Sequence, residues 1–146
     1  MERQFILSCC STVDLPYNYL KSRDIPVLFY TYVVDGVEYM DDMGRDAEAL
    51  PRFYQFLEQG KMPSTSQINV AGYTEFFENL LQKGDVLHIS FTSGQSGSVN
   101  NAYAAAKALR EKYPDKKMEV IDSLCSSTGY GMLVDMLADM RDAGKS

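Results

Sequence analysis

Stretches rich in β-branched and aromatic residues alternate along this chain with stretches in which apolar residues recur at helical spacing. The former predict strands over residues 4–8, 26–34 and 118–121, and a further strand that starts at Val86. The latter predict helices over residues 49–59, 69–82 and 99–112, and a last helix with Leu133, Met136, Leu137 and Met140 on one face. Because strands and helices alternate after residue 46, the pattern predicts an α/β domain with a mainly parallel sheet.

Residues typical of turns and helix ends predict the local structure of the first forty residues. Asp14 is expected to cap a short helix that has Pro16 in its first turn. Asp35 and Gly36 form a strong tight-turn signal, so residues 37–39 are expected to return as a hairpin partner of the 26–34 strand. This part of the chain is therefore expected to hold one short helix and one hairpin.

Three polar turns follow predicted strands, at residues 10–12, 90–98 and 122–128. In a parallel sheet, ligands gather at the carboxyl ends of the strands, so these turns are expected to converge at one edge. A further hydroxyl-rich turn, at residues 64–67, precedes its own helix and would have to reach the same edge. Two such turns, each ahead of a helix, favour a binding site.

The turn at residues 90–98 has the layout of an anion site. It leads from a strand into a helix, whose first amide groups and dipole attract negative charge. No Lys or Arg lies between Val86 and Ala106, so a modest anion such as one carboxylate is expected. The neighbouring apolar residues suggest a ligand with a polar head and an apolar body: Ile68, Val70, Phe76, Phe77 and Phe91.

Composition narrows the classes of function. The chain has 146 residues, of which 45% are apolar and 23% charged, as in ordinary globular proteins. A net charge of −6 argues against general nucleic-acid binding. The apolar runs are too short for a membrane span, and the first ten residues do not resemble a signal peptide. The three cysteines follow no disulfide framework. These features together predict a cytoplasmic location.

Catalytic and cofactor motifs are weak. The chain has neither a Walker A nor a dinucleotide-binding glycine pattern, and its His and Cys residues do not cluster at metal-ligand spacing. The acidic loop at residues 41–46 does not match the EF-hand pattern. Gly94 to Ser98 departs from the nucleophile elbow, because the second glycine comes one place early. The one histidine, His88, is expected in the core, but an acyl hydrolase or a phosphotransfer enzyme that uses Ser96 stays an alternative.

Four motifs together resemble the DegV family of bacterial fatty-acid-binding proteins over nearly the whole chain. They are Cys-Ser-Thr-Val-Asp-Leu-Pro at 10–16, Pro-Ser-Thr-Ser-Gln at 63–67, Ser-Gly-Gln-Ser-Gly-Ser at 93–98 and Val-Ile-Asp-Ser at 120–123. The resemblance implies a three-layer α/β/α domain with a mainly parallel sheet. It implies binding of one long-chain fatty acid, with the carboxylate on Thr65 and Ser96 and with Ser66, Ser93 and the Gly97 backbone as neighbours.

Family members serve as the lipid-presenting subunit of a two-part fatty acid kinase, in which a separate ATP-binding protein phosphorylates the carboxylate. They continue into a second α/β domain that closes over the ligand. Residues 1–146 are therefore expected to be the N-terminal domain alone, either as part of a longer protein or as a natural truncation, without cofactor or metal and with apolar surface exposed. The chain departs from the family pattern at Cys10, where Asp is usual, at Gln95, where Leu is usual, and at Ser98, where Thr is usual.

Overall fold

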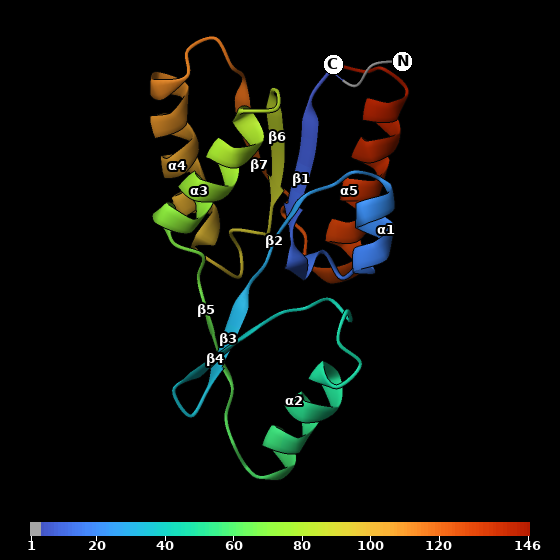
Figure 1. Cartoon of the computed structure of the whole chain (residues 1–146), viewed down its shortest axis with the longest axis vertical. Helices are drawn as coiled ribbons and strands as arrows, with labels where there is room; N and C mark the ends of the chain where they lie inside the picture. Colours follow the sequence, from blue (N-terminus) through green and yellow to red (C-terminus); the bar gives the residue numbers. More distant parts are fainter. Residues whose placement is uncertain (1–3) are drawn as a thin grey trace.

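A four-stranded parallel sheet forms the centre of the fold in the computed structural model, which describes residues 4–146 (Figure 1). Its strands are β1 (Ile6–Cys10), β2 (Val27–Leu28), β6 (Val86–Ser90) and β7 (Met118–Asp122), in the order β2-β1-β6-β7. Each neighbouring pair runs parallel. The predicted α/β domain with a mainly parallel sheet is confirmed.

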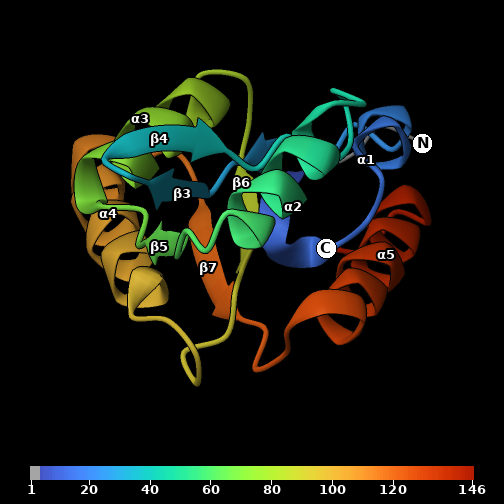
Figure 2. The same cartoon turned by 90° about the horizontal axis from the view of Figure 1, so that it is seen from below.

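Helices cover both faces of this sheet. The helices α3 (Val70–Leu81) and α4 (Ser98–Lys112) lie on one side, and α1 (Tyr17–Ser22) and α5 (Ser127–Asp142) lie on the other (Figures 1 and 2). The three layers are those that the family resemblance implies. Among the described residues, none of the helices combines the length and the apolar character that a membrane crossing needs.

A second, antiparallel sheet extends below the parallel one in Figure 1. It consists of β3 (Thr31–Val34), which pairs with both β4 (Val37–Met40) and β5 (Ser64–Ser66), and it is accompanied by α2 (Ala49–Glu58). We call residues 31–66 the hairpin unit. Asp35 and Gly36 have φ angles of 50° and 80°, as a two-residue hairpin turn requires, so the predicted hairpin is confirmed.

Two expectations about this region are wrong. The single strand predicted over residues 26–34 is two strands in different sheets, because Phe29 and Tyr30 carry the chain from one sheet to the other. The Tyr30 amide donates to the Ser11 hydroxyl at 3.0 Å, outside either ladder. The turn predicted at residues 64–67 is largely an edge strand, because its backbone pairs with β3.

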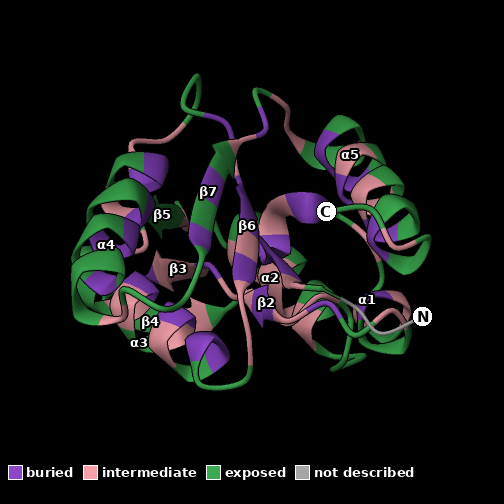
Figure 3. Ribbon diagram, turned by 90° about the horizontal axis from the view of Figure 1, so that it is seen from above, coloured by how far each residue is buried: buried purple, intermediate pink, exposed green. Residues whose placement is uncertain are grey.

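The core lies in the middle of the parallel sheet and under the helices on its two faces (Figure 3). Four of the five residues in each of β1 and β6 are buried. The α4 stripe Ala102, Ala105, Ala106 and Leu109 is buried as its spacing predicts. Alanine side chains let α4 pack close to α3 and β7.

The buried face of α5 differs in part from the one predicted: Leu133 and Leu137 do pack, half-buried, against the core, but other residues are buried more deeply. Tyr130, Val134, Ala138 and Arg141 are buried, whereas Met132, Met136 and Met140 are 61%, 60% and 50% exposed. The Tyr130 hydroxyl selects this face, since it donates to the Ile89 carbonyl and accepts from the Cys10 amide. Leu, Met and Val occur all around this helix, so apolar spacing alone does not distinguish its two faces.

Glycine sets how closely α5 approaches the turn after β1. A Cβ atom added at Gly131 would lie 2.7 Å from the Val13 carbonyl oxygen, closer than real side chains come. At the opposite end of α5, the buried Arg141 donates to the Arg23 and Asp24 carbonyl oxygens. Both ends of α5 are thus fixed by polar backbone contacts as well as by apolar packing.

The start of α1 also differs from expectation. Pro16 occupies the N-cap position of α1, and Asp14 makes no cap. Asp14 instead ends a short 3-10 turn over Ser11–Val13, with a left-handed φ of 51°. Asp tolerates this conformation better than most residues, which accounts for its place there.

Candidate functional site

The loop that joins β6 to α4 places Ser96 at the start of a long helix. The Ser96 hydroxyl accepts from the Ser98 amide at 3.1 Å, and Gly97 is the N-cap residue of α4. Ser96 and Gly97 are half-buried. A hydroxyl that accepts one hydrogen bond can still donate its own proton, so Ser96 remains a donor at a helix end that favours negative charge.

The strand β5 carries Thr65 and Ser66 on opposite faces of the small sheet. Thr65 lies opposite Tyr32 and Ser66 opposite Thr31 in the antiparallel register. Directly opposed residues share a face, and the Ser66 and Thr31 hydroxyls indeed lie 3.1 Å apart. Thr65 therefore faces the Tyr32 side and Ser66 faces away from it, although the two are adjacent in sequence.

The structure brings the segment after β5 against the Ser-Gly loop. A Cβ atom built on Gly97 would lie 3.1 Å from Nε2 and 3.3 Å from Oε1 of Gln67. Nearby, Asn101 in the first turn of α4 donates to the Ile68 carbonyl at 2.8 Å. The two hydroxyl-rich segments, some thirty residues apart in sequence, thus meet at the carboxyl edge of the parallel sheet.

Ser93 contacts a carboxylate of the protein itself. Its amide donates to Oδ1 and Oδ2 of Asp122 at 3.2 and 3.3 Å, and the Leu124 amide donates to Oδ1 at 3.0 Å. Partial burial raises the pKa of Asp122, but hydrogen bonds from Ser93 and Leu124 outweigh it and hold the pKa below its usual value. The Ser93 amide therefore binds the carboxylate at the end of β7.

His88 is a core residue, as predicted. Its Nδ1 lies 3.0 Å from the Ser8 hydroxyl and its Nε2 lies 3.6 Å from Cys10 Sγ. The rings of Phe76 and Phe77 pack edge-on against it. Burial lowers the pKa of His88 to about 3. Both ring nitrogens are engaged within the core, so His88 supplies no base to Ser96.

Hydroxyls and a thiol continue from His88 toward the start of α4. Cys10 Sγ lies 3.7 Å from the Tyr73 hydroxyl, which lies 3.0 Å from the Ser98 hydroxyl. Burial raises the pKa of Cys10 to about 11, so the thiol keeps its proton. Two departures from the family pattern, Cys10 and Ser98, therefore belong to one buried polar network below the Ser-Gly loop.

An aromatic cluster lies on the face of the small sheet that carries Thr65. Tyr32 stacks on Tyr39 with ring centroids 5.4 Å apart, and Phe53 and Phe56 of α2 meet these two rings at 5.3 Å. All four side chains are half-buried. The sequence signal for this cluster was weak, because Tyr and Phe in the hairpin unit read as ordinary strand and helix residues.

The sequence predicts apolar contacts for a ligand at residues that the structure places partly elsewhere. Phe77 is fully buried against His88, so it belongs to the core and lines no ligand surface. Phe76, Phe91 and Ile68 are half-buried, and Val70 is 41% exposed. The half-buried aromatic surface beside Thr65 lies instead on the hairpin unit.

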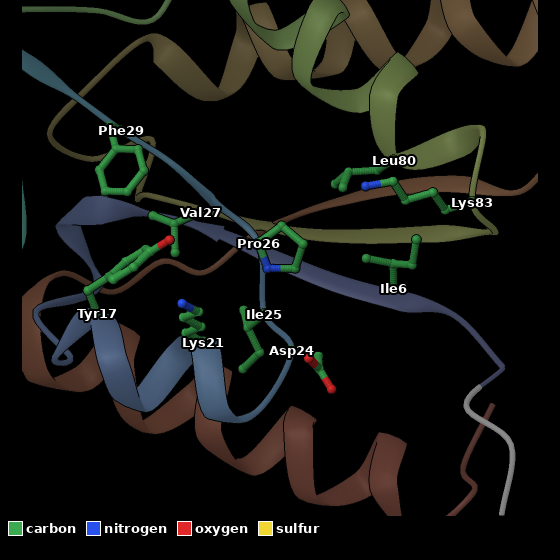
Figure 4. A pocket seen from close by; sticks show the side chains of 10 residues that line it. All are labelled: Ile6, Tyr17, Lys21, Asp24, Ile25, Pro26, Val27, Phe29, Leu80 and Lys83. Atoms are coloured by element: carbon green, nitrogen blue, oxygen red, sulfur yellow. The ribbon is translucent and has the colours of Figure 1, made fainter.

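A separate hollow of about 420 Å³ runs along the β2 edge of the parallel sheet (Figure 4). Tyr17 and Lys21 of α1 border it on one side and Leu80 and Lys83 on the other. Its lining includes none of Thr65, Ser66, Ser93, Ser96 or Gly97. Among the described residues, no group of three or more His, Cys, Asp or Glu side chains is arranged to hold a metal ion.

The sequence of this chain is similar to sequences of the DegV family. The sequence model of the uncharacterised DegV family matches residues 10–146. A DegV domain-containing protein from Clostridium perfringens is 37% identical over 146 residues, which are 99% of this chain and 50% of that protein. The chain spans about half the length of the curated relatives that it matches.

Solved structures share the fold. A stearic acid-binding protein from Eubacterium ventriosum has a TM-score of 0.85 and 26% identity, with 97% of this chain and 49% of that chain covered. The Fatty Acid Kinase (Fak) B3 protein from Streptococcus pneumoniae, solved with linoleic acid, has a TM-score of 0.79 and 22% identity, with 98% and 50% covered.

Proposed function

The chain belongs to the DegV family, and from this premise we propose that it binds the carboxylate end of a long-chain fatty acid between Thr65 and Ser96. The observation that carries the proposal is the close approach of Gln67 to Gly97, together with the Asn101–Ile68 hydrogen bond, which brings the Thr65 strand to the Ser96 loop. The stearic acid named for the Eubacterium ventriosum protein is a ligand of the same class.

The hydroxyl of Ser96 is the main head-group donor in this proposal. It lies at the start of α4, where the helix dipole favours an anion, and its proton is not needed for the contact with the Ser98 amide. Thr65 adds a second hydroxyl from the hairpin unit. Ser93 and Ser66 are given no direct role, because the Ser93 amide binds Asp122 and Ser66 faces Thr31.

The acyl chain is proposed to run from this head group along the aromatic cluster on the Thr65 face. Tyr32, Tyr39, Phe53 and Phe56 are half-buried there and offer apolar ring surface. Each methylene that leaves water contributes about 0.8 kcal/mol, so a modest stretch of chain on these rings supplies substantial affinity.

Since the chain spans half the length of its relatives, we further propose that a second domain closes over the acid in the natural protein. We also propose that a separate ATP-binding kinase then phosphorylates the bound carboxylate in the cytoplasm. The chain itself is proposed to be non-catalytic. Acyl-phosphate formation that requires both proteins, and that Ser96→Ala reduces, tests this role.

Ligand binding is tested with the protein at its natural length. Native mass spectrometry should find a co-purified acyl chain, and Thr65→Val and Ser96→Ala should each weaken binding of stearic acid. Loss of one hydrogen bond to a charged group costs about 1.5–3 kcal/mol, or about 10–100-fold in affinity. Ser64→Ala is the matched control, because Ser64 lies on β5 on the face opposite Thr65.

Absence of a bound acid, together with unchanged binding in both variants, would refute the proposal. A fluorophosphonate probe distinguishes the alternative of a serine-dependent hydrolase, since it labels an activated serine. The position of His88, which contacts Ser8 and Cys10, speaks against such activation of Ser96.

A further inference from the structure

Tyr30 lies where the chain passes from the parallel sheet to the hairpin unit, and its backbone is fixed on both sides. Its amide donates to the Ser11 hydroxyl at 3.0 Å, and its carbonyl accepts from the Asp41 amide at 2.9 Å. The ring meets Phe91 edge-on at 6.2 Å. The side chain is 8% exposed, so its direction is determined by packing.

The hydroxyl of Tyr30 is buried and makes no well-formed hydrogen bond among the described residues. The hydroxyls of Ser98, Ser96 and Tyr73 lie close enough to lower the pKa of Tyr30 against the larger effect of burial, but none of them meets its hydroxyl in good hydrogen-bond geometry. Ser98 is already bonded to Tyr73, and Ser96 already accepts from the Ser98 amide. A buried donor that makes no well-formed hydrogen bond is uncommon in folded proteins and calls for an explanation.

The chemistry of this hydroxyl is that of a donor. Burial raises the pKa of Tyr30, so the phenol keeps its proton. The segment from Val86 to Ala106 contains no Lys or Arg, so uncharged donors carry the recognition of an anion here. Ser96 is half-buried beside Tyr30, and an oxygen that binds Ser96 therefore comes next to the Tyr30 hydroxyl.

We propose that Tyr30 is a third head-group ligand, whose hydroxyl donates to an oxygen of the carboxylate that Ser96 binds. The inference rests on the proposed function and deepens it, because it adds a donor from a part of the chain that carries no binding motif. Tyr30 and Tyr32 are two residues apart on one run of chain, so the same run would contact the head of the acid at Tyr30 and its body at Tyr32.

Such a donor also contributes to selectivity. A site built around a donor rejects a ligand that offers it a poorer acceptor. Stearic acid offers a charged acceptor, whereas octadecanol, with the same chain length, offers a neutral one. Tyr30 should therefore strengthen the preference for the acid over the alcohol.

The test is Tyr30→Phe, which removes one oxygen atom and keeps the ring contact with Phe91. In the protein at its natural length, stearic acid should bind about 10–100-fold more weakly to this variant, and the preference for stearic acid over octadecanol should fall. Thermal stability without ligand should be unchanged or higher, because the variant loses no well-formed hydrogen bond. Tyr103→Phe is the matched control, since Tyr103 is 40% exposed on α4.

Carboxyl-labelled stearic acid gives a second readout that a purely structural tyrosine would not move. Its carboxyl ¹³C resonance in the complex should shift between the natural protein and Tyr30→Phe. If Ser96→Ala weakens binding while Tyr30→Phe leaves affinity and resonance unchanged, the Tyr30 inference is overturned and the proposed function stands. If the natural protein binds no fatty acid, the proposed function fails and the Tyr30 inference fails with it.

Discussion

His88 should make the stability of this protein fall as the solution becomes mildly acidic. In the folded state the imidazole is enclosed by Ser8, Cys10 and two phenylalanine rings, and burial lowers its pKa to about 3. In the unfolded chain its pKa should be near the ordinary value of about 6.5. Below that pH the unfolded state binds a proton that the folded state does not.

The size of the effect follows from this difference in bound protons. The free energy of unfolding changes with pH in proportion to the protons bound by the unfolded state minus those bound by the folded state. That difference approaches one proton between the two pKa values, a slope of about 1.4 kcal/mol per pH unit. From pH 7.5 to pH 5 the integrated loss is about 2 kcal/mol, and stability is lost as pH falls.

Urea unfolding at pH 7.5, 6 and 5 measures this loss. Far-ultraviolet circular dichroism is the suitable signal, because the chain has no tryptophan. His88→Gln should remove this loss of about 2 kcal/mol between pH 7.5 and 5, an average of about 0.6 proton over the range, whatever it does to stability at neutral pH. Most carboxylates titrate below this range, so they contribute little to the comparison.

The ring resonance of His88 checks the same reasoning without a substitution. The chain has one histidine, so its signal is unambiguous. In the folded protein it should not titrate above pH 5. A titration midpoint between 6 and 7 in the folded state, or equal pH slopes for the natural protein and His88→Gln, would refute the argument.

Two further outcomes depend on packing. Gly131→Ala should lower the free energy of unfolding by about 1–3 kcal/mol, because the new methyl group meets a backbone carbonyl oxygen at 2.7 Å. Gly129→Ala, whose nearest neighbour is 3.7 Å away, should raise the free energy of unfolding by about 0.4–1 kcal/mol. Equal urea midpoints for the two variants would contradict this difference. Brief alkylation of the folded protein at pH 8 should modify Cys125 and spare Cys9 and Cys10, which are fully buried and whose pKa values burial raises. Peptide mass spectrometry measures the labelling, and equal labelling of Cys10 and Cys125 would contradict this expectation.

The layered fold could be predicted because its signals are local. The spacing of Ala102, Ala105 and Ala106 defines one face of α4, and the runs around Val86 and Val120 mark buried parallel strands. These signals describe which residues leave water, and a parallel sheet with helices on both faces is the simplest way to satisfy them. Asp35 and Gly36 likewise specify their turn through backbone conformation alone.

The sequence-based predictions were wrong where contacts between distant parts of the chain determine the local structure. Residues 26–34 are uniformly strand-like, and nothing in their composition marks the change of sheet at Phe29 and Tyr30. The α5 helix has apolar residues on more than one face, and its orientation depends on the Tyr130 hydroxyl, which reaches the Ile89 carbonyl forty-one residues away. Periodicity cannot include a hydrogen bond of that range.

Some residues of the candidate site could likewise be predicted from sequence, and others could not. Thr65 and Ser96 are readable from sequence, because hydroxyls before a helix are recognisable and the family motifs add to them. The register that separates Thr65 from Ser66, and the carboxylate that holds Ser93, become visible only in the folded chain. Tyr30 looks like one more strand tyrosine until its hydroxyl, which makes no well-formed hydrogen bond among the described residues, is seen beside Ser96.

The hairpin unit is the part of the fold with the least buried material, since α2 has no buried residue and β5 pairs with β3 alone. Segments of this kind open locally at lower free energy than a packed core does. Under the proposed function, an acid that bridges Ser96 and Thr65 ties this loosely held unit to the rigid parallel sheet. Affinity for the acid and local order of the unit are then coupled in one equilibrium. Substitutions on α2 far from the carboxylate would weaken binding through the order of the unit, without any change in the contacts that the head group makes.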